Sequence, residues 1–381
     1  MLRVRVYIGL ISTFSPLFLS AESGKDFMLL PENLGRGNTG ISRPRSESAM
    51  YFNPAGLQSA EPEVAVQETS DPKDAKSVEK KSTRTYRVIV LDPALEASTQ
   101  LIKVAQKAKG TSAEEAADII NDNMGKPLHA GVSNSIGFTL HSVGFQFFQS
   151  GFADGLIHKD PHQGAIDTVD LSLDKNIGII TGYSHSFLQN RLSLGSSLYL
   201  LQRTSFQTTT NIADLDFKDK FKTKDLESTG QGIGMHVGAT YKFENSLDSR
   251  VGAVIRNLGT TTFSEKKKQD SNLYPMKQEI TIGYSHVHNT MIGAFIPHVD
   301  LIDLTGNRYT NTLYKLHLGL EYVIKQTIGF TGGINEGYKT GSLYLDFQHF
   351  RFDAGAYSAE MGNFIGDKQD FRVFFRISGI I

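Results

Sequence analysis

The chain has 381 residues, with 39 basic and 40 acidic side chains and a formal net charge of −1. Because basic and acidic side chains are nearly equal in number, the chain lacks the excess of positive charge that is typical of nucleic-acid-binding proteins. We therefore expect no nucleic-acid partner. A mean hydropathy of −0.24 excludes a bundle of transmembrane helices. It does not exclude a membrane β-barrel, whose strands alternate apolar and polar residues.

The first 21 residues have the layout of a secretory signal peptide. Arg3 and Arg5 precede an apolar stretch from Tyr7 to Leu19, and the small residues Ser20 and Ala21 follow. The stretch is too short for a typical membrane span. We therefore predict that residues 1–21 direct export across the inner membrane; the alternative is a retained membrane anchor.

Residues 22–60 are rich in glycine and proline and keep no sustained period, so we predict a compact irregular segment there. It contains a glycine-rich turn at Gly35, Gly37 and Gly40, and the run Phe52-Asn53-Pro54-Ala55-Gly56. Residues 70–83 are charged, which indicates a solvated stretch.

Helical periodicity is confined to one region. Ala94 to Lys109 has apolar residues near one face of a helix. A capping box beginning at Ser112 predicts the start of a second helix, which Gly125-Lys126-Pro127 ends. We delimit this helical insertion as residues 92–127.

From Leu128 onward the hydrophobic period is two, which is typical of strands with one apolar face. Many segments exceed the usual 5–6 residues of a globular strand and approach the ~9–11 of a membrane-spanning one. Thirteen strands are predicted, at 128–140, 143–153, 166–187, 192–206, 229–243, 250–258, 277–287, 291–301, 312–324, 327–335, 342–347, 350–358 and 370–381. One more from 61–69 or 84–91 gives an all-β, antiparallel barrel of about fourteen strands. A soluble β-sandwich or propeller is the alternative.

The predicted connections alternate in length. Long, polar ones fall at 154–165, 207–228, 259–276, 302–311, 336–341 and 359–369, and short ones fall between them. Short inner turns and long outer loops are typical of outer-membrane barrels. By this parity the C-terminus lies on the inner side and the helical insertion on the outer side.

Two stretches resemble the long-chain fatty-acid outer-membrane transporter family, the FadL-like barrels, and their PorV-like relatives. They are Asn33-Leu-Gly-Arg-Gly-Asn-Thr-Gly40 and Glu47-Ser-Ala-Met-Tyr-Phe-Asn-Pro-Ala-Gly-Leu57. More diffuse similarity runs through Val251-Gly-Ala-Val-Ile-Arg-Asn-Leu-Gly259 and the terminal hairpins. A small spirochaetal branch of FadL-like proteins is the most similar group.

The resemblance implies a fourteen-stranded barrel, residues 61–381, with residues 22–60 folded into its lumen as a hatch. Phe52, Asn53, Pro54, Ala55 and Gly56 would form the hatch tip, and Gly35, Gly37 and Gly40 its glycine-rich turn. A barrel of this size otherwise encloses a channel, so a plug has a physical role. The helical insertion and the terminal Gly-Ile-Ile depart from the family pattern and leave the ligand open.

No pattern in the sequence points to an enzyme, a metal or a cofactor. His286 and His288 share a strand face but lack an evident third ligand. Ser184 and His185 are adjacent and so face opposite sides of a strand, which excludes a dyad. Nucleophile-elbow, phosphate-loop and zinc-helix motifs are missing from the sequence.

The sequence therefore predicts an outer-membrane channel, surrounded by lipid, for hydrophobic small molecules such as long-chain fatty acids. The alternatives are a PorV-like barrel that holds a secretion or surface-assembly partner through the helical insertion, and a surface-exposed structural protein or adhesin.

Overall fold

A computed structural model describes residues 27–45, 48–58, 86–107, 113–140, 142–160, 166–211, 227–267, 273–309, 311–325, 327–347, 349–361 and 366–381. The predicted signal peptide, the charged stretch 70–83 and the capping serine Ser112 lie outside these residues.

The helices are short. They are α1 (Pro31–Leu34), α2 (Ala49–Phe52), the 3₁₀ turn η1 (Pro54–Leu57), α3 (Thr99–Lys107), α4 (Ala113–Asp122) and α5 (Thr312–Lys315). Across the described residues, no helix combines the length and apolarity needed to cross a bilayer.

One sheet contains all the strands. They are β1 (Tyr86–Leu91), β2 (Ala94–Ser98), β3 (Pro127–Leu140), β4 (Val143–Asp160), β5 (Ile166–Phe187), β6 (Leu192–Asn211), β7 (Ser228–Lys242), β8 (Arg250–Arg256), β9 (Ser264–Lys267), β10 (Glu279–Ser285), β11 (His288–Asn289), β12 (Gly293–Leu301), β13 (Leu316–Ile324), β14 (Ile328–Asn335), β15 (Tyr338–Asp346), β16 (Phe350–Glu360) and β17 (Gln369–Ile380).

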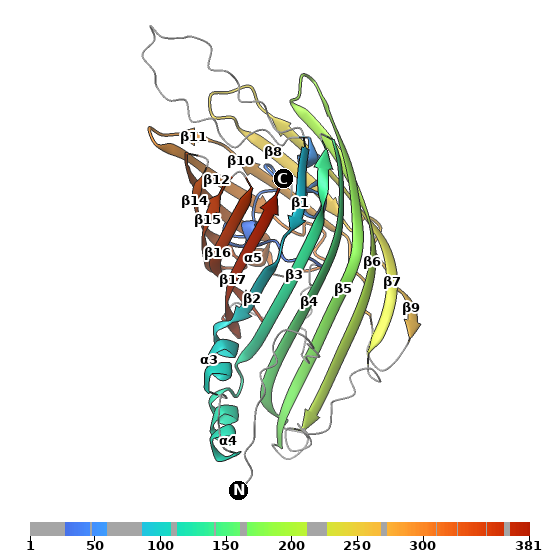
Figure 1. Cartoon of the computed structure of the whole chain (residues 1–381), viewed down its shortest axis with the longest axis vertical. Helices are drawn as coiled ribbons and strands as arrows, with labels where there is room; N and C mark the ends of the chain where they lie inside the picture. Colours follow the sequence, from blue (N-terminus) through green and yellow to red (C-terminus); the bar gives the residue numbers. More distant parts are fainter. Residues whose placement is uncertain are drawn as a thin grey trace.

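The sheet closes on itself as an antiparallel barrel (Figure 1). Both β1 and β2 pair with β17 on one side and with β3 on the other, so together they form one interrupted strand. The short strands β9 and β11 pair beside β7 and β12. With β1 and β2 counted as one, fourteen strands form the wall, which confirms the predicted fold class.

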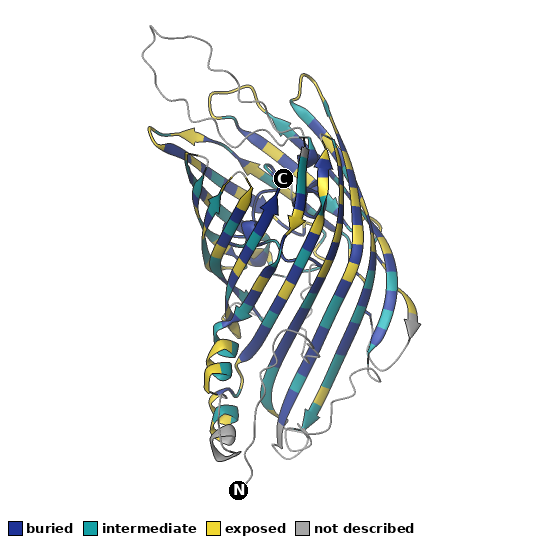
Figure 2. Ribbon diagram, viewed as in Figure 1, coloured by how far each residue is buried: buried dark blue, intermediate teal, exposed yellow. Residues whose placement is uncertain are grey.

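Alternation along the strands separates two environments. In β3 the side chains of His129, Ser133 and Ser135 are buried inside the barrel, whereas Val132 and Ile136 are 44% and 46% exposed on the outside. Bands of buried and exposed residues alternate in this way around the wall (Figure 2). The inverted arrangement, apolar outward and polar inward, is the one a barrel in lipid requires.

The predicted helix from Ala94 is wrong over its first five residues, which form β2. Glu96 and Ser98 point inward and are buried, while Leu95, just before Glu96, is 54% exposed. That two-residue alternation, together with pairing to β3 and β17, outweighs the helical spacing of the apolar residues. The helical insertion is therefore α3 and α4 rather than residues 92–127.

The connections follow the predicted alternation in length, but some predicted bounds are wrong. β4 continues to Asp160 and β6 to Asn211, inside the predicted loops 154–165 and 207–228, and α5 replaces the first four residues of the predicted strand 312–324. The predicted loop 336–341 is wrong, because Glu336 and Gly337 form a two-residue turn between β14 and β15 with positive φ at both positions. We call the end of the barrel that carries residues 188–191, 243–249 and the C-terminus the short-turn end. The other is the long-loop end.

The helices α3 and α4 stand beyond the wall at the long-loop end (Figure 1). Lys107 bonds Asp122 at 2.8 Å, and the Gln100 side chain donates to Asn123, so the two helices hold each other. No residue of α3 is buried. The pair therefore projects from the barrel instead of contributing to its interior.

Candidate functional site

The described part of the N-terminal segment, residues 27–45 and 48–58, lies against the inner wall of the barrel. All eight predicted hatch residues are buried there: Gly35, Gly37, Gly40, Phe52, Asn53, Pro54, Ala55 and Gly56. The segment is anchored along its length to strands on several sides. The Phe27 carbonyl accepts from Ser150 of β4, and the Met50 carbonyl accepts from Ser197 of β6.

The glycine-rich turn fits its place because it lacks side chains. Gly37 and Gly40 have φ of +74° and +124°, a region that side-chain-bearing residues rarely adopt. A Cβ at Gly37 would clash with the carbonyl oxygens of β13 and β14. The backbone amides of Gly40 and Ile41 donate to Asp300 of β12 at 2.8 and 3.1 Å. The turn is thus bound to the wall through its backbone.

Asn53 organises the predicted hatch tip. Its side-chain oxygen accepts from the Ala55 amide at 3.2 Å, which caps η1, and its side-chain nitrogen donates to the Ile41 carbonyl at 2.7 Å. The Pro44 ring packs against Gly56, where a Cβ would not fit. These bonds join the two sequence motifs of the segment to each other.

Four pairs of glycines on the wall face the segment. Gly144–Gly182, Gly195–Gly238, Gly252–Gly283 and Gly319–Gly333 each lie directly opposite one another on neighbouring strands. A Cβ at any of them would meet atoms of the segment, at Met50, Pro54, Asn53, Ile41, Thr39 or Gly37. We call them the glycine pairs. They thin the wall where the segment packs against it, since glycine permits close backbone approach.

The lumen is charged on one side. Glu321 of β13 accepts from Arg36 at 2.9 Å, from Arg45 at 2.5 Å and from the Tyr344 hydroxyl at 2.7 Å. Its side chain is only 5% exposed. Buried ion pairs add little net stability but strongly disfavour separation of the partners. They therefore hold the segment in one register against β13.

A second buried network joins the segment to the interrupted strand. Arg376 of β17 binds Glu32 of α1 at 2.5 Å and Asp92 at 2.6 Å. Asp92 also accepts from Ser135 and Ser378. Asp92 and Pro93 separate β1 from β2, and proline has no amide hydrogen for the ladder. The break in the wall is thus tied, through one guanidinium, to the N-terminal segment.

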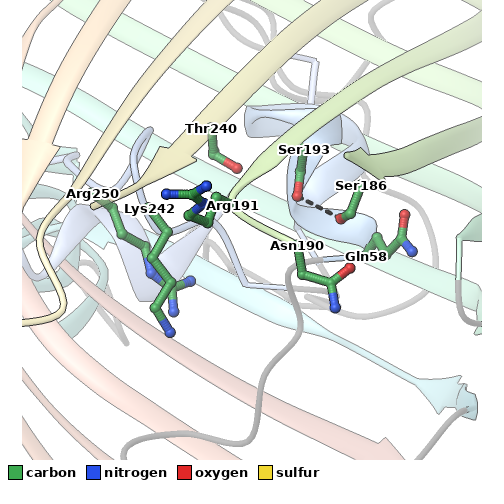
Figure 3. A pocket seen from close by; sticks show the side chains of 8 residues that line it. All are labelled: Gln58, Ser186, Asn190, Arg191, Ser193, Thr240, Lys242 and Arg250. Carbon is green, nitrogen blue, oxygen red and sulfur yellow. Dashed lines mark hydrogen bonds between the residues drawn. The ribbon is translucent and has the colours of Figure 1, made fainter. Parts of the chain in front are cut away.

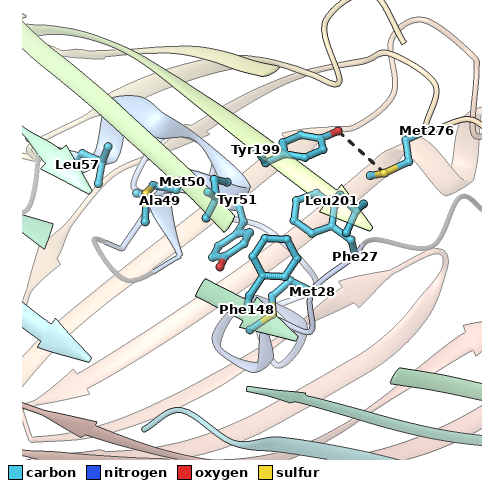
Figure 4. Close-up of a cluster of buried hydrophobic side chains, with 11 residues drawn as sticks. Phe27, Met28, Ala49, Met50, Tyr51, Leu57, Phe148, Tyr199, Leu201 and Met276 are labelled. Carbon is cyan, nitrogen blue, oxygen red and sulfur yellow. Dashed lines mark hydrogen bonds between the residues drawn. The ribbon is translucent and has the colours of Figure 1, made fainter. Parts of the chain in front are cut away.

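The opposite side of the lumen is apolar. Phe148, Tyr199 and Leu201 of the wall point inward and are 0–1% exposed. Phe27 packs on Phe148 and Tyr199 with ring centroids 5.1 and 4.8 Å apart, and Tyr51 meets Phe148 edge-on at 5.7 Å. Met28, Ala49, Met50, Leu57, Ile180 and Met276 complete this cluster (Figure 4). We call it the lumenal apolar cluster.

Two predicted exclusions concern single side chains. Ser184 is buried and His185 is exposed, so the pair does face opposite sides of β5. Among the described residues no group of three histidine or carboxylate side chains is arranged so that it could hold a metal ion, and the absence of a metal at His286 and His288 stays a prediction.

A buried histidine escaped the sequence analysis. His129 lies between Asp154 at 2.5 Å and Glu96 at 2.7 Å, and the Tyr357 hydroxyl donates to Glu96. These residues come from β2, β3, β4 and β16. In the sequence, the only signal for these four residues is that each occupies an inward-facing position of its strand. Which of them bond to one another depends on the register of four strands, and the sequence does not give that register.

Three solved structures align with most of this chain. The Ralstonia pickettii toluene transporter TbuX aligns with a TM-score of 0.50 and 13% identity, covering 93% of this chain and 98% of that chain. The Pseudomonas putida toluene transporter TodX has a TM-score of 0.45 and 11% identity over 91% and 95% of the two chains. A Pseudomonas aeruginosa FadL homologue has a TM-score of 0.45 and 10% identity over 93% and 99%.

The TbuX likeness establishes a shared fold, and the resemblance to FadL-like outer-membrane barrels is confirmed at that level. The spirochaetal branch stays a prediction. No curated protein matches the sequence.

A sequence family covers the first part of the barrel. The family described as "F plasmid transfer operon, TraF, protein" matches residues 90–295, which is more than half of the chain. That range begins in β1, at the start of the wall, and ends within β12. With this match over most of its strands, the chain belongs to the family of F plasmid transfer operon TraF proteins.

Proposed function

We propose that the chain is an exported outer-membrane channel for the uptake of hydrophobic small molecules such as long-chain fatty acids. In this proposal residues 1–21 direct export, residues 22–60 act as a hatch, and residues 61–381 form the barrel. The outer saccharide layer of the membrane hinders the entry of apolar molecules. The barrel would give them a path that is shielded from this layer.

The lumenal apolar cluster is the observation that carries this proposal. A barrel that conducts ions or polar solutes has a polar interior. Here Phe148, Tyr199 and Leu201 present an apolar inner surface, which Phe27 and Tyr51 of the N-terminal segment cover. An apolar ligand that entered from the long-loop end would find this surface when the segment shifts. The fold shared with a toluene transporter supports the same class of ligand.

Two exits are compatible with the wall. The ligand could pass the displaced segment toward the short-turn end, or leave sideways into the membrane. The second route has a physical basis at the interrupted strand. β1 pairs with β3 up to Ile89–Gly137, and β2 resumes at Ala94–Ser133. On this side three residues of β3 therefore have no ladder partner, while on the other side they pair with β4. A gap in the ladder is the weakest part of a closed wall.

A reversible cross-link tests hatch movement. The hydroxyl oxygens of Ser42 in the segment and Ser285 in β10 are 2.8 Å apart, which suits a disulfide after substitution by cysteine. The chain has no other cysteine. We expect Ser42→Cys/Ser285→Cys to take up oleate or toluene into proteoliposomes when reduced, and to lose uptake when oxidised.

The outcomes separate the routes and the function. Uptake that persists in the oxidised protein excludes passage by movement of this part of the segment. The oxidised single variant Ser42→Cys is the matched control for oxidation itself. Absence of uptake in every form, and of any apolar molecule in native mass spectrometry of purified protein, would contradict the channel.

A partner-binding barrel is the second candidate. Two observations favour it: the helices α3 and α4 project from the barrel, with no residue of α3 buried, and the chain belongs to a family named for a plasmid transfer operon. Detergent extraction distinguishes the two. A protein that co-purifies in fixed stoichiometry, and is lost when residues 99–126 are replaced by a short turn, supports this candidate.

A further inference from the structure

The connection between β8 and β10 contains two arms that lie side by side, residues 257–263 and 273–278. The amides of Thr261 and Met276 each donate to the other residue's carbonyl at 2.9 Å, which makes a short antiparallel bridge. Thr261 and Met276 are buried, whereas Tyr274 is 57% exposed. We call the two arms the strap. It therefore has one buried face and one exposed face.

The strap packs against three glycines that occupy alternate positions of β7. They are Gly230, Gly232 and Gly234. Their positions are on the same face of the strand as Gly238, which faces the N-terminal segment. A Cβ at Gly232 would lie 2.8 Å from the Thr262 carbonyl oxygen, and one at Gly234 would lie 2.2 Å from the Thr261 hydroxyl oxygen. The strap can thus lie against the inner face of the wall because this part of β7 has no side chains on that face.

The Tyr199 hydroxyl fastens the strap to β6. It donates to the Asn257 side-chain oxygen at 2.7 Å and, since it has only one hydrogen, accepts from the Thr261 hydroxyl at 2.7 Å. The Met276 sulfur lies 4.0 Å from the same hydroxyl (Figure 4). One side chain of the wall therefore contacts both arms of the strap.

The strap leaves β8 in a strained backbone conformation. Asn257, Gly259 and Thr260 have φ of 50°, 77° and 66°, in the left-handed region. That region is uncommon for residues other than glycine and is a genuine outlier for a β-branched residue such as threonine. Strain of this kind persists only where neighbouring contacts hold it, and it is frequent in segments that switch conformation. The contacts with Tyr199 and β7 therefore hold a conformation that the local preferences of the chain oppose.

The buried face of the strap covers part of the lumenal apolar cluster. Met276 belongs to that cluster, and Phe263 packs against it. The Arg203 guanidinium lies 5.2 Å from the centre of the Phe263 ring and holds this side chain in place. Side chains of the strap thus occupy apolar surface that the wall offers to the lumen.

The two ends of the barrel differ in what they offer to a solute. At the short-turn end the N-terminal segment borders a small cavity of about 150 Å³, beside Gln58 (Figure 3). Its lining is polar, and the hydroxyls of Ser186 and Ser193 share a hydrogen bond of 2.8 Å there. The strap, in contrast, connects β8 to β10 at the long-loop end. It therefore lies on the side from which we propose that an apolar ligand enters.

We propose that the strap is a lid on the lumenal apolar cluster, and that an apolar ligand reaches the cluster by displacing Met276 and Phe263. This inference rests on the proposed function, which requires such a ligand. Without a ligand, the strap's own side chains keep water from the cluster. A ligand replaces these contacts by contacts of the same kind, so the strap can open without exposing the apolar surface to water.

Two variants weaken the closed strap at different contacts. Thr261→Val removes the hydroxyl that bonds Tyr199, and one hydrogen bond of ordinary net strength shifts an equilibrium about fivefold. Gly232→Ala places a methyl group against the Thr262 carbonyl, which should favour the open strap about tenfold. Because uptake passes through the open state, we expect the initial rate of toluene uptake into proteoliposomes to rise by about these factors.

Each variant has a matched control within the wall. Thr204→Val removes a hydroxyl that bonds Thr229 of the neighbouring strand at 3.0 Å. Gly332→Ala adds a methyl group that meets only the Thr340 carbonyl oxygen, at an ordinary 3.8 Å. We expect both controls to take up toluene at the wild-type rate. A heat-dependent shift in gel mobility verifies that every variant still forms a barrel.

Hydrogen exchange measures the opening of the strap independently of uptake. The Thr261 and Met276 amides are bonded only while the two arms lie together. We expect their exchange to accelerate about fivefold in Thr261→Val and about tenfold in Gly232→Ala. In the wild-type protein, toluene should accelerate the exchange of both amides, because the ligand competes with Met276 for the cluster.

The outcomes distinguish failure of the strap from failure of the channel. Uptake by wild type that neither variant accelerates, or slower exchange of the strap amides with toluene, overturns the strap and leaves the proposed function standing. Uptake by the two variants but not by wild type supports the strap as a lid. Absence of uptake in every form contradicts the channel and the strap together.

Discussion

At the scale of single residues, the wall and the N-terminal segment pack closely because glycines in the wall leave room for the segment. Gly238 of β7 lies opposite Gly195 of β6, and a Cβ at Gly238 would clash with the Asn53 side-chain oxygen. Asn53 in turn holds the Ile41 carbonyl. A single methyl group at this position therefore acts on the bond that joins the two motifs of the segment.

We expect Gly238→Ala to loosen the segment without opening the barrel. Overpacking a tight contact costs about 1–3 kcal/mol, which Asn53 can avoid by moving away from the wall. Faster hydrogen exchange of residues 48–58, and higher ion conductance in planar bilayers, measure the effect. The control is Gly151→Ala, since a Cβ at Gly151 finds only ordinary contacts beyond 3.5 Å. Equal conductance in both variants would contradict a plugging segment.

The sequence showed which residues of the segment matter but not how they are held. The motifs around Gly35 and Asn53 predicted a special segment because glycine and proline carry local conformational meaning. Their wall partners, Glu321, Asp300 and Arg376, lie up to 344 positions away in the chain. The glycine pairs are equally invisible without strand register, since Gly195 and Gly238 are isolated glycines in the sequence.

At the scale of elements, the strands were predictable because each has a lipid side and a lumen side. The bounds of β5, Ile166–Phe187, agree with the predicted 166–187, and from Asn176 to His185 buried and exposed residues alternate along it. The first strand was not predictable in the same way. Asp92 and Pro93 divide it into pieces of six and five residues, and each piece is too short to show a clear period.

The loop after β12 shows how one carboxylate orders a connection. Asp303 accepts from the Thr305 hydroxyl at 2.6 Å and from the amides of Asn307, Arg308 and Tyr309 at 2.7–3.0 Å. Burial alone would raise the pKa of this carboxyl, but these hydrogen bonds hold it below the usual value. A lowered pKa means that the ionised form stabilises the folded loop.

We expect the loop to loosen in acid. Its stabilisation is complete above the ordinary aspartate pKa of about 3.9 and is lost as the pH falls through the lower pKa of the folded state. Hydrogen exchange of the Asn307–Tyr309 amides, corrected for the intrinsic rate, should therefore accelerate below about pH 4. Asp303→Asn should exchange faster at neutral pH and show no such acid transition. A transition of the same size in the variant would assign it to another group.

At the scale of the whole molecule, every inference depends on lipid around the outer wall. Leu198 at the middle of β6 is 51% exposed and Leu304 in the loop after β12 is 47% exposed. In a water-soluble protein the two leucines would be equivalent, and arginine at either would change stability by less than about 0.5 kcal/mol. In a bilayer only Leu198 faces hydrocarbon, where arginine costs about 2–4 kcal/mol near the midplane.

We therefore expect Leu198→Arg to lower the free energy of unfolding in phospholipid vesicles by about 2–4 kcal/mol, and Leu304→Arg to leave it nearly unchanged. Reversible guanidinium titration, followed by tyrosine fluorescence, measures both. The two variants carry the same chemical change at nearly the same exposure. A difference between their free energies of unfolding therefore reflects only what surrounds the two positions. If both lose the same small amount, the outer wall does not face lipid, and the apolar residues on it require another cover.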